Sequence, residues 1–179
     1  MALKDLRSRK KRRAPTLTEI SFSHRINGND LAVIQRHIKN VPVKVGALAT
    51  DLGLKVVLAT LPMNISGLIQ PEDGDGFVIK INRFESKERQ RFTIAHEISH
   101  YLLHRDRINA GIIDSVLYRS KLSSRIEAEA NRLAADIVMP RQAVSAEMAN
   151  FAKDLGDDEI SDLAEKFQVS KQAMAIRVG

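Results

Sequence analysis

Residues 91–104 read Arg-Phe-Thr-Ile-Ala-His-Glu-Ile-Ser-His-Tyr-Leu-Leu-His, and no other stretch of the chain constrains the fold as strongly. The apolar residues follow the period of an α-helix, and Ser86 is a candidate N-cap, so we expect a helix from residue 86 to about residue 104. His96 and His100 lie four positions apart, which places both imidazoles on one helix face, one turn apart. Zinc accepts neutral imidazole nitrogens, and two rings in this arrangement can bind one ion.

Glu97 directly follows the first histidine and can reach a metal-bound water without binding the metal itself. Because zinc lowers the pKa of a bound water to about 7, a neighbouring carboxylate can take its proton and deliver it to a leaving amine. Glu97 is therefore the candidate catalytic residue. The alternative for His-Glu-x-x-His alone is an exposed helix with ordinary surface histidines. The flanking apolar residues argue instead for a largely buried helix, in which histidines need partners; they are Ile94, Ala95, Ile98, Leu102 and Leu103.

A catalytic zinc needs a third protein ligand. The metzincin arrangement would place a histidine ten residues after His96, but that position is Asp106, so this variant is excluded. In the gluzincin-like arrangement a second helix supplies a glutamate. A helix expected over about 124–138, stopped by Pro140, carries Glu127.

Asn131 shares a helix face with Glu127 and is suited to orient a ligand histidine through a hydrogen bond. Ser124-Arg-Ile-Glu127 also fits a capping box, in which Glu127 reaches back to the start of the helix. Spacing alone leaves these two roles of Glu127 level, with Glu129 as another candidate ligand. A fourth ligand would close the open metal position, so we expect a structural hydrogen bond for His104.

Three further residues are candidates for stabilising a developing oxyanion, and the sequence does not choose among them: Tyr101, Tyr118 and Arg132.

The amino-acid composition limits which residues can bind a metal ion in this chain. The chain has 179 residues, the size of one ordinary domain with appendages, and it contains no Cys. Thiolate zinc sites, disulfides and a cysteine nucleophile are therefore excluded, and a metal needs His and carboxylate ligands. Aromatic residues make up 4% of the chain, too few for the stacking platforms that bind single strands.

The net charge of +6 is confined to the start of the chain: residues 1–13 account for all of it. We expect a flexible basic arm over 1–20, a metallopeptidase-like domain over 21–150 and a helical segment over 151–179 that packs on it. No long apolar run follows the basic residues, so we expect a cytoplasmic protein with no membrane segment. The arm is interpreted as a solvated tail, with nonspecific contact to nucleic acid or an acidic partner as the weaker alternative.

Helices and strands are not interleaved one by one, which predicts an α+β class. We expect early helices over 28–40 and 43–52, then strands over 54–61, 65–69 and 77–81. Turn residues between the last two strands predict an antiparallel hairpin. We interpret 77–82 as an edge strand that can hold an extended peptide.

Residues 43–140 resemble the ImmA/IrrE family of zinc metallopeptidases. The matching motifs are Leu48…Gly53-Leu54, Ile65-Ser66-Gly67, residues 91–104, and Glu127-x-x-Ala130-Asn131 leading to Met139-Pro140. The chain departs from the family at Ser99, usually Gly, and at Leu133, usually Phe.

The resemblance implies zinc bound by His96, His100 and Glu127, with Glu97 as the catalytic carboxylate. It also implies a zincin-like fold with a small, mainly antiparallel sheet on the metal-binding helix. The expected activity is a zinc endopeptidase, and family members typically act on a helix-turn-helix repressor or antitoxin and so regulate transcription. The rival interpretation is a non-catalytic regulator or toxin–antitoxin component with the same fold.

Residues 160–177 have the pattern of a helix-turn-helix, with Ser170 as a candidate cap of its second helix. The segment 151–179 carries a net charge of −2, however, and DNA affinity depends mainly on neutralising phosphates. We therefore expect a packing role for these helices, with DNA binding through them and the basic arm as the alternative.

Overall fold

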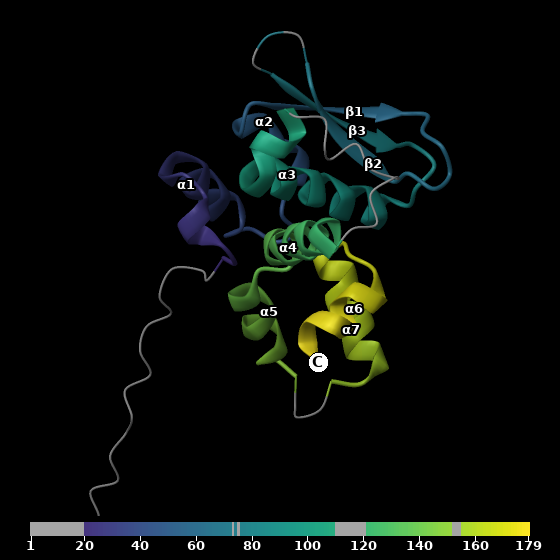
Figure 1. Cartoon of the computed structure of the whole chain (residues 1–179). Coiled ribbons are helices and arrows are strands. Elements are labelled where there is room, and N and C mark those ends of the chain that lie inside the picture. Colours follow the sequence, from purple (N-terminus) through teal and green to yellow (C-terminus); the bar gives the residue numbers. More distant parts are fainter. Residues whose placement is uncertain (1–19, 73, 75, 110–120, 152–154) are drawn as a thin grey trace, which may run out of the picture.

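The computed structural model describes residues 20–72, 74, 76–109, 121–151 and 155–179, and it confirms the α+β class. The early elements are η1 (Ser23–Arg25), α1 (Gly28–His37), α2 (Val45–Asp51), β1 (Leu54–Ala59), β2 (Gly67–Pro71) and β3 (Phe77–Asn82). The later helices are α3 (Lys87–Asn109), α4 (Lys121–Val138), α5 (Arg141–Met148), α6 (Asp157–Phe167) and α7 (Lys171–Val178). The sheet lies on α3, α3 lies on α4, and the last three helices lie beyond α4 (Figure 1). The predicted arm falls outside the described residues except for Ile20, which is buried.

The sheet is small and mixed, with the strand order β1-β3-β2. β2 and β3 form the predicted antiparallel hairpin, with Ile69 opposite Ile79, while β1 pairs with β3 in parallel. The interpretation of 77–82 as an edge strand is wrong, because β3 is the central strand. Every residue of β3 except Lys80 is buried, and a strand covered on both faces needs a nearly continuous apolar run. The edge strands of this sheet are β1 and β2, and β2 is the edge strand that packs on α3.

Helix α3 begins where the sequence predicts: the Oγ of Ser86 accepts a hydrogen bond from the backbone N–H of Arg89 at 3.2 Å. It approaches β2 closely at Gly67, where an added Cβ would lie 2.5 Å from Cγ2 of Thr93. The helical backbone is interrupted at His104, whose φ is −136° and ψ is 26°. The kink in α3 therefore coincides with His104, the last histidine of this helix.

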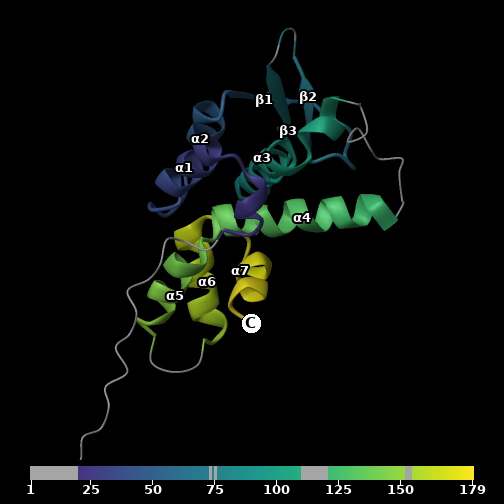
Figure 2. The ribbon, with the colours of Figure 1, turned by 60° about the vertical axis from the view of Figure 1, so that its left-hand side comes forward.

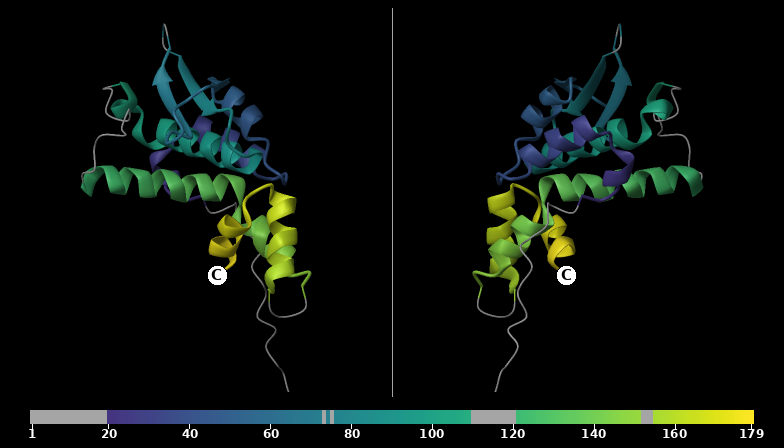
Figure 3. Two further views of the ribbon diagram at one scale, coloured as in Figure 1. Left: turned by 90° about the vertical axis from the view of Figure 1, so that its right-hand side faces the viewer. Right: turned by 90° about the vertical axis from the view of Figure 1, so that its left-hand side faces the viewer.

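Helix α4 runs along α3 and separates the sheet half of the molecule from the C-terminal helices (Figure 3). Ala130 and Ala134 are fully buried, as expected for small residues at a close helix contact. The described part of the helix begins at Lys121, so Ser124 lies inside it and not at an N-cap, which the alternative capping role of Glu127 would require.

The segment before α2 packs against α3 and α4 from one side (Figure 2). The side chain of Asn27 caps α1 by accepting a hydrogen bond from the N–H of Asp30 at 2.9 Å. Ile34 and Val43 are fully buried in the core shared with α3 and α4. This segment is thus part of the fold that positions the site.

Helices α6 and α7 form the helix-turn-helix shape expected from the sequence, with the predicted cap: the Oγ of Ser170 accepts a hydrogen bond from the N–H of Ala173 at 3.1 Å. The side chain of Arg91 donates to the carbonyl of Gln168 at 3.2 Å and so connects α3 to the turn. The boundaries at residues 20 and 150 stay predictions. Within the described residues, no helix combines the length and the apolarity that crossing a bilayer requires.

Candidate metal centre

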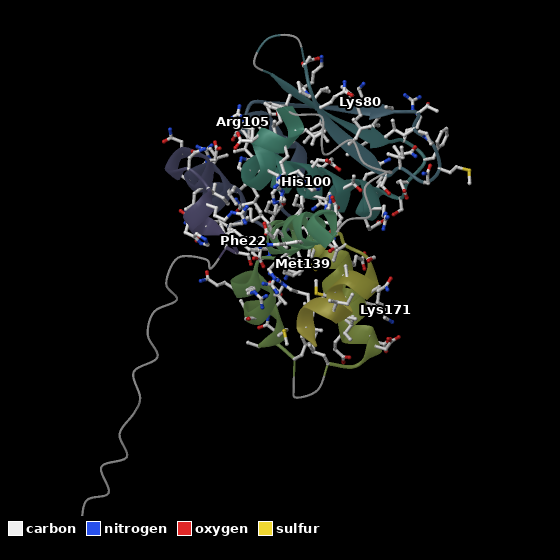
Figure 4. The ribbon with its side chains drawn as sticks, in the orientation of Figure 1. Phe22, Lys80, His100, Arg105, Met139 and Lys171 are labelled. Carbon is white, nitrogen blue, oxygen red and sulfur yellow. The ribbon has the colours of Figure 1, made fainter. Side chains whose placement is uncertain are left out.

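The candidate site lies where α3 and α4 meet, close to His100 (Figure 4). His96 and His100 project from α3, and Glu127 projects from α4. The Nε2 atoms of the two histidines lie 3.0 Å apart. The Glu127 carboxylate is 3.2 Å from Nε2 of His96 through one oxygen, and 3.3 Å from Nε2 of His100 through the other. The structure therefore brings together the three residues predicted as metal ligands.

These distances fit a metal ion. Metal–ligand distances of about 2.0–2.1 Å in a tetrahedron correspond to edges of about 3.3 Å between ligand atoms. The two Nε2 atoms lie 3.0 Å apart, close to that edge, and each of them has a different oxygen of Glu127 within 3.3 Å. With one atom from each residue, the three ligand atoms lie within 4.8 Å of one another, so these residues could hold one ion and leave a further position for a water or a substrate.

The hydrogen bonds behind the ring of His96 support the same conclusion. Its Nδ1 lies 3.0 Å from Oδ1 of Asn131, which is an acceptor, so Nδ1 carries the hydrogen and Nε2 of the neutral ring has a free lone pair. That lone pair faces the carboxylate of Glu127 and the Nε2 of His100. Acceptor atoms converging in this way need a metal ion or a proton between them. Asn131 therefore occupies the orienting position that the sequence predicts.

The titratable groups reflect this crowding. Without a metal ion, a proton on Nε2 of His96 can take the place of the cation. Burial disfavours this charged ring, but its hydrogen bond to Glu127 and the charges of Glu97 and Glu127 outweigh burial and raise the pKa of His96 above its ordinary value. In the same metal-free state, hydrogen bonds from His100 and His96 hold the pKa of Glu127 well below its usual range. Glu127 is thus a carboxylate, the form that binds a metal.

Glu97 lies beside this group and is 5% exposed. Burial raises the pKa of its carboxyl above the ordinary value, and the nearby charge of Glu127 acts in the same direction, while His96 and His100 oppose it. A carboxyl with a raised pKa is suited to accepting and releasing a proton near neutral pH. This placement agrees with the predicted role of Glu97 as the acid–base residue.

Two other sequence candidates have different partners. Glu129 binds Arg25 at 2.6 Å and Arg125 at 2.9 Å, so its oxygens do not join the ligand triangle. The ring of Tyr101 packs edge-on against Phe77, with a centroid distance of 5.3 Å.

Of the remaining oxyanion candidates, Arg132 lies on the exposed face of α4 and Tyr118 falls outside the described residues. Sequence reasoning missed Arg25, which is 104 positions away from its partner Glu129. No periodicity or motif connects two residues that far apart.

His104 forms the structural hydrogen bonds expected of it. Its Nδ1 lies 3.3 Å from Nδ1 of His100, and its Nε2 lies 3.2 Å from a carboxylate oxygen of Glu129. Burial lowers the pKa of His104, which favours the neutral ring. His104 thus contacts Nδ1 of His100, just as Asn131 contacts Nδ1 of His96.

Comparison with known proteins places these residues in a wider context. Residues 49–178 match the peptidase M78 family, described as the IrrE N-terminal-like domain, and this range contains all three candidate ligands and Glu97. The radiation response metalloprotease IrrE of Deinococcus radiodurans is 34% identical over 104 residues, which are 58% of this chain and 30% of that protein. The chain therefore spans less than a third of the length of this relative.

A solved structure, a transcriptional regulator of Mycobacterium tuberculosis, is similar to this chain with a TM-score of 0.55. The similarity covers 86% of this chain and 47% of that chain at 17% sequence identity, and it shows a shared fold alone.

Proposed function

The chain belongs to the peptidase M78 family, and from this premise we propose that it is a zinc-dependent endopeptidase that hydrolyses a peptide bond in a protein partner. The observation that carries the proposal is the convergence of two imidazole nitrogens and one carboxylate within 4.8 Å of one another, beside a buried glutamate. The composition supports zinc, because a site without Cys that combines two His and one Glu is typical of catalytic zinc.

In this proposal His96, His100 and Glu127 hold the ion, which supplies Lewis-acid activation of a water molecule and of the scissile carbonyl. Asn131 accepts a hydrogen bond from the Nδ1–H group of His96 and so keeps the Nε2 of this ring free to bind the ion. Glu97 takes a proton from the attacking water as the water oxygen bonds to the carbonyl carbon. The Glu97 carboxyl then gives this proton to the amide nitrogen, so that the C–N bond breaks and the amine leaves neutral.

The free edge of β2 is where we place an extended substrate. β2 packs on α3, the helix that carries both histidines, and its backbone is paired with β3 on one side only among the described strands. A peptide can add to such an edge through main-chain hydrogen bonds. The hypothesis of peptide binding thus moves from β3 to β2.

For the partner we propose a helix-turn-helix transcriptional regulator or an antitoxin. The support is the family resemblance, together with a relative named for a radiation response. Hydrolysis of such a partner would regulate transcription. In the competing toxin–antitoxin or non-catalytic role, the same fold would act by binding alone.

Metal analysis of the purified full chain tests the site. We expect one zinc per chain in the wild type and none in Glu127→Ala. We expect Glu129→Ala still to bind one zinc, although more weakly, because the Glu129 carboxylate binds Arg25 and Arg125 and is not one of the three ligands. Loss of zinc in Glu129→Ala with retention in Glu127→Ala would transfer the ligand role to Glu129 and refute our assignment.

Hydrolysis is tested with Glu97→Gln, which keeps the three ligands and removes the proton acceptor. An extract of cells lacking the protein is incubated with zinc-loaded wild type or variant, and new protein N-termini are identified by mass spectrometry. We expect new N-termini with the wild type only. If Glu97→Gln gives the same N-termini, or retains the full biological effect, hydrolysis by this site is not the function.

A further inference from the structure

The tautomer of His100 is set by a chain of hydrogen bonds that leads away from the candidate metal centre. The carboxylate of Glu129 can only accept, so Nε2 of His104 carries a hydrogen and donates it at 3.2 Å. The neutral His104 ring then has its lone pair at Nδ1, which accepts the Nδ1 hydrogen of His100 at 3.3 Å. Nε2 of His100, the atom that faces Glu127, consequently has a free lone pair.

The chain ends at Arg25, a residue from η1 that precedes the family-matching range 49–178. One terminal nitrogen of Arg25 donates to the Glu129 oxygen that also accepts from His104, at 2.6 Å. The other donates to the backbone carbonyl of Leu103 at 3.3 Å. Arg25 thus binds both the acceptor of His104 and the backbone next to it.

The second contact of Arg25, to the carbonyl of Leu103, lies next to the kink in α3. α3 loses its helical backbone at His104, the next residue, and Arg25 binds the carbonyl at that kink. The guanidinium also lies 5.6 Å from the ring centre of Phe22, which helps to hold it in place. Phe22 directly precedes η1, and it lies below His100 in Figure 4.

We propose that Arg25, acting through Glu129 and His104, is a positioning residue that fixes the tautomer and the orientation of the His100 ring for metal binding. The inference rests on the proposed function in that it assigns a role around the same metal site. It adds a residue from outside the family-matching range to the support of that site.

Arg125 provides a matched comparison within the same cluster. It also binds Glu129, at 2.9 Å, but through the other carboxylate oxygen. Its side chain is 77% exposed, whereas that of Arg25 is 34% exposed and that of Glu129 is 12% exposed. A solvated arginine contributes charge but little positional constraint. Arg25 is therefore the residue that determines where Glu129 lies.

The first experiment measures the zinc dissociation constant of the full chain by competition with a chelator. We expect Glu129→Ala and His104→Leu to weaken binding by about 10- to 100-fold, as is usual when a group that orients a ligand is removed. Arg25→Ala is expected to weaken binding by about tenfold, toward the lower end of that range. Arg125→Ala and Arg36→Ala, which removes an exposed ion pair with Asp51, should stay within about twofold of the wild type.

Two readouts separate positioning from a general loss of structure. If Arg25 acts through Glu129, adding Arg25→Ala to Glu129→Ala changes the affinity no further. The absorption spectrum of the Co²⁺-substituted protein should also shift in Arg25→Ala, because the geometry around the ion changes. Additive effects, or an equal loss in Arg125→Ala, would overturn the assignment to Arg25.

The second experiment needs no metal, so it remains decisive if the proposed function fails. Histidine side-chain ¹⁵N shifts of the metal-free chain report which ring nitrogen carries the hydrogen. We expect His100 to be protonated at Nδ1 in the wild type and in Arg36→Ala, and to become a mixture of tautomers in Arg25→Ala. A wild type that binds no zinc refutes the metal site, whereas an unchanged His100 tautomer in Arg25→Ala refutes the role of Arg25.

Discussion

At the scale of single residues, the two candidate ligand rings are both fixed at Nδ1, but by groups of different chemistry. Asn131 holds His96 through a side-chain amide on the same helix as Glu127. His104 holds His100 through another imidazole on the same helix as His100 itself. The Nδ1 side of the His96 ring is thus held from α4, whereas the Nδ1 side of the His100 ring is held from its own helix.

We predict that Asn131→Ala weakens zinc binding by about 10- to 100-fold, because the His96 ring loses the acceptor that fixes its tautomer. Asn131→Asp keeps an acceptor at this position and should retain binding within about threefold of the wild type. Chelator competition measures both values. Equal affinities for Asn131→Ala and the wild type would show that the hydrogen bond at 3.0 Å does not orient the ring.

The residues of the site differ in how far the sequence could predict them. His96 and His100 followed from a spacing of four on a helix, which places them on one face whatever surrounds them. Spacing alone leaves Glu127 level between a ligand and a cap, the family resemblance favours the ligand, and in the structure Ser124 lies inside α4 rather than at an N-cap. Arg25 reaches the site only through the tertiary fold, so local sequence contains no signal for it.

At the scale of elements, the distance between β2 and α3 depends on Gly67. An added Cβ there would lie 2.5 Å from Cγ2 of Thr93 and 3.0 Å from the backbone carbonyl oxygen of Lys80. The Thr93 side chain is held by its hydrogen bond to the carbonyl of Arg89 at 2.9 Å. An alanine at Gly67 would therefore have to move the strand away from the helix.

We predict that Gly67→Ala lowers the free energy of unfolding by about 1–3 kcal/mol, the usual effect of overpacking. Gly46→Ala is the control: that residue lies in α2 with no atom near its Cβ position, and alanine there should stabilise by about 0.5–1 kcal/mol. Urea denaturation measures both. Thr93→Ser removes the clashing methyl group, so it should recover part of the loss; no recovery would place the strain elsewhere.

The elements were predictable to within a few residues, but their arrangement was not. Caps at Ser86 and Ser170 are local interactions, and the structure contains both. The position of β3 between β1 and β2 depends on pairing between strands that are distant in the chain. The apolar run of 77–81, interrupted only by Lys80, is the local signal for burial on both faces, but it does not show which strand pairs on either side.

At the scale of the whole molecule, one buried acidic residue joins three parts of the chain. Asp136, in α4, is 2% exposed and lies 2.8 Å from a terminal nitrogen of Arg177 in α7. Its other oxygen accepts a hydrogen bond from the backbone N–H of Ser21 at 2.9 Å. Arg177 also donates to the carbonyl of Met139. The helix that carries Glu127 is thus fastened to both ends of the described chain.

We predict that Arg177→Ala lowers the free energy of unfolding by about 3–5 kcal/mol, because it leaves a buried carboxylate without its main partner. Lys171→Ala is the control on the same helix, since Lys171 pairs with Asp157 at the surface and should contribute less than about 1 kcal/mol. Urea denaturation of metal-free protein measures the difference. Similar values for the two variants would show that the Asp136 ion pair is not important for stability.

The segment from Ile20 to Val43 lies before the family-matching range, yet it supplies core side chains, the Ser21 amide and the Arg25 guanidinium. An expression fragment that starts at residue 49 would therefore expose apolar surface of α3 and α4. It would also lack Arg25, and so leave Glu129 without this ion-pair partner. The limits of sequence similarity are thus not the limits of the folding unit. Anyone who excises this domain for crystallisation should begin upstream of Ile20.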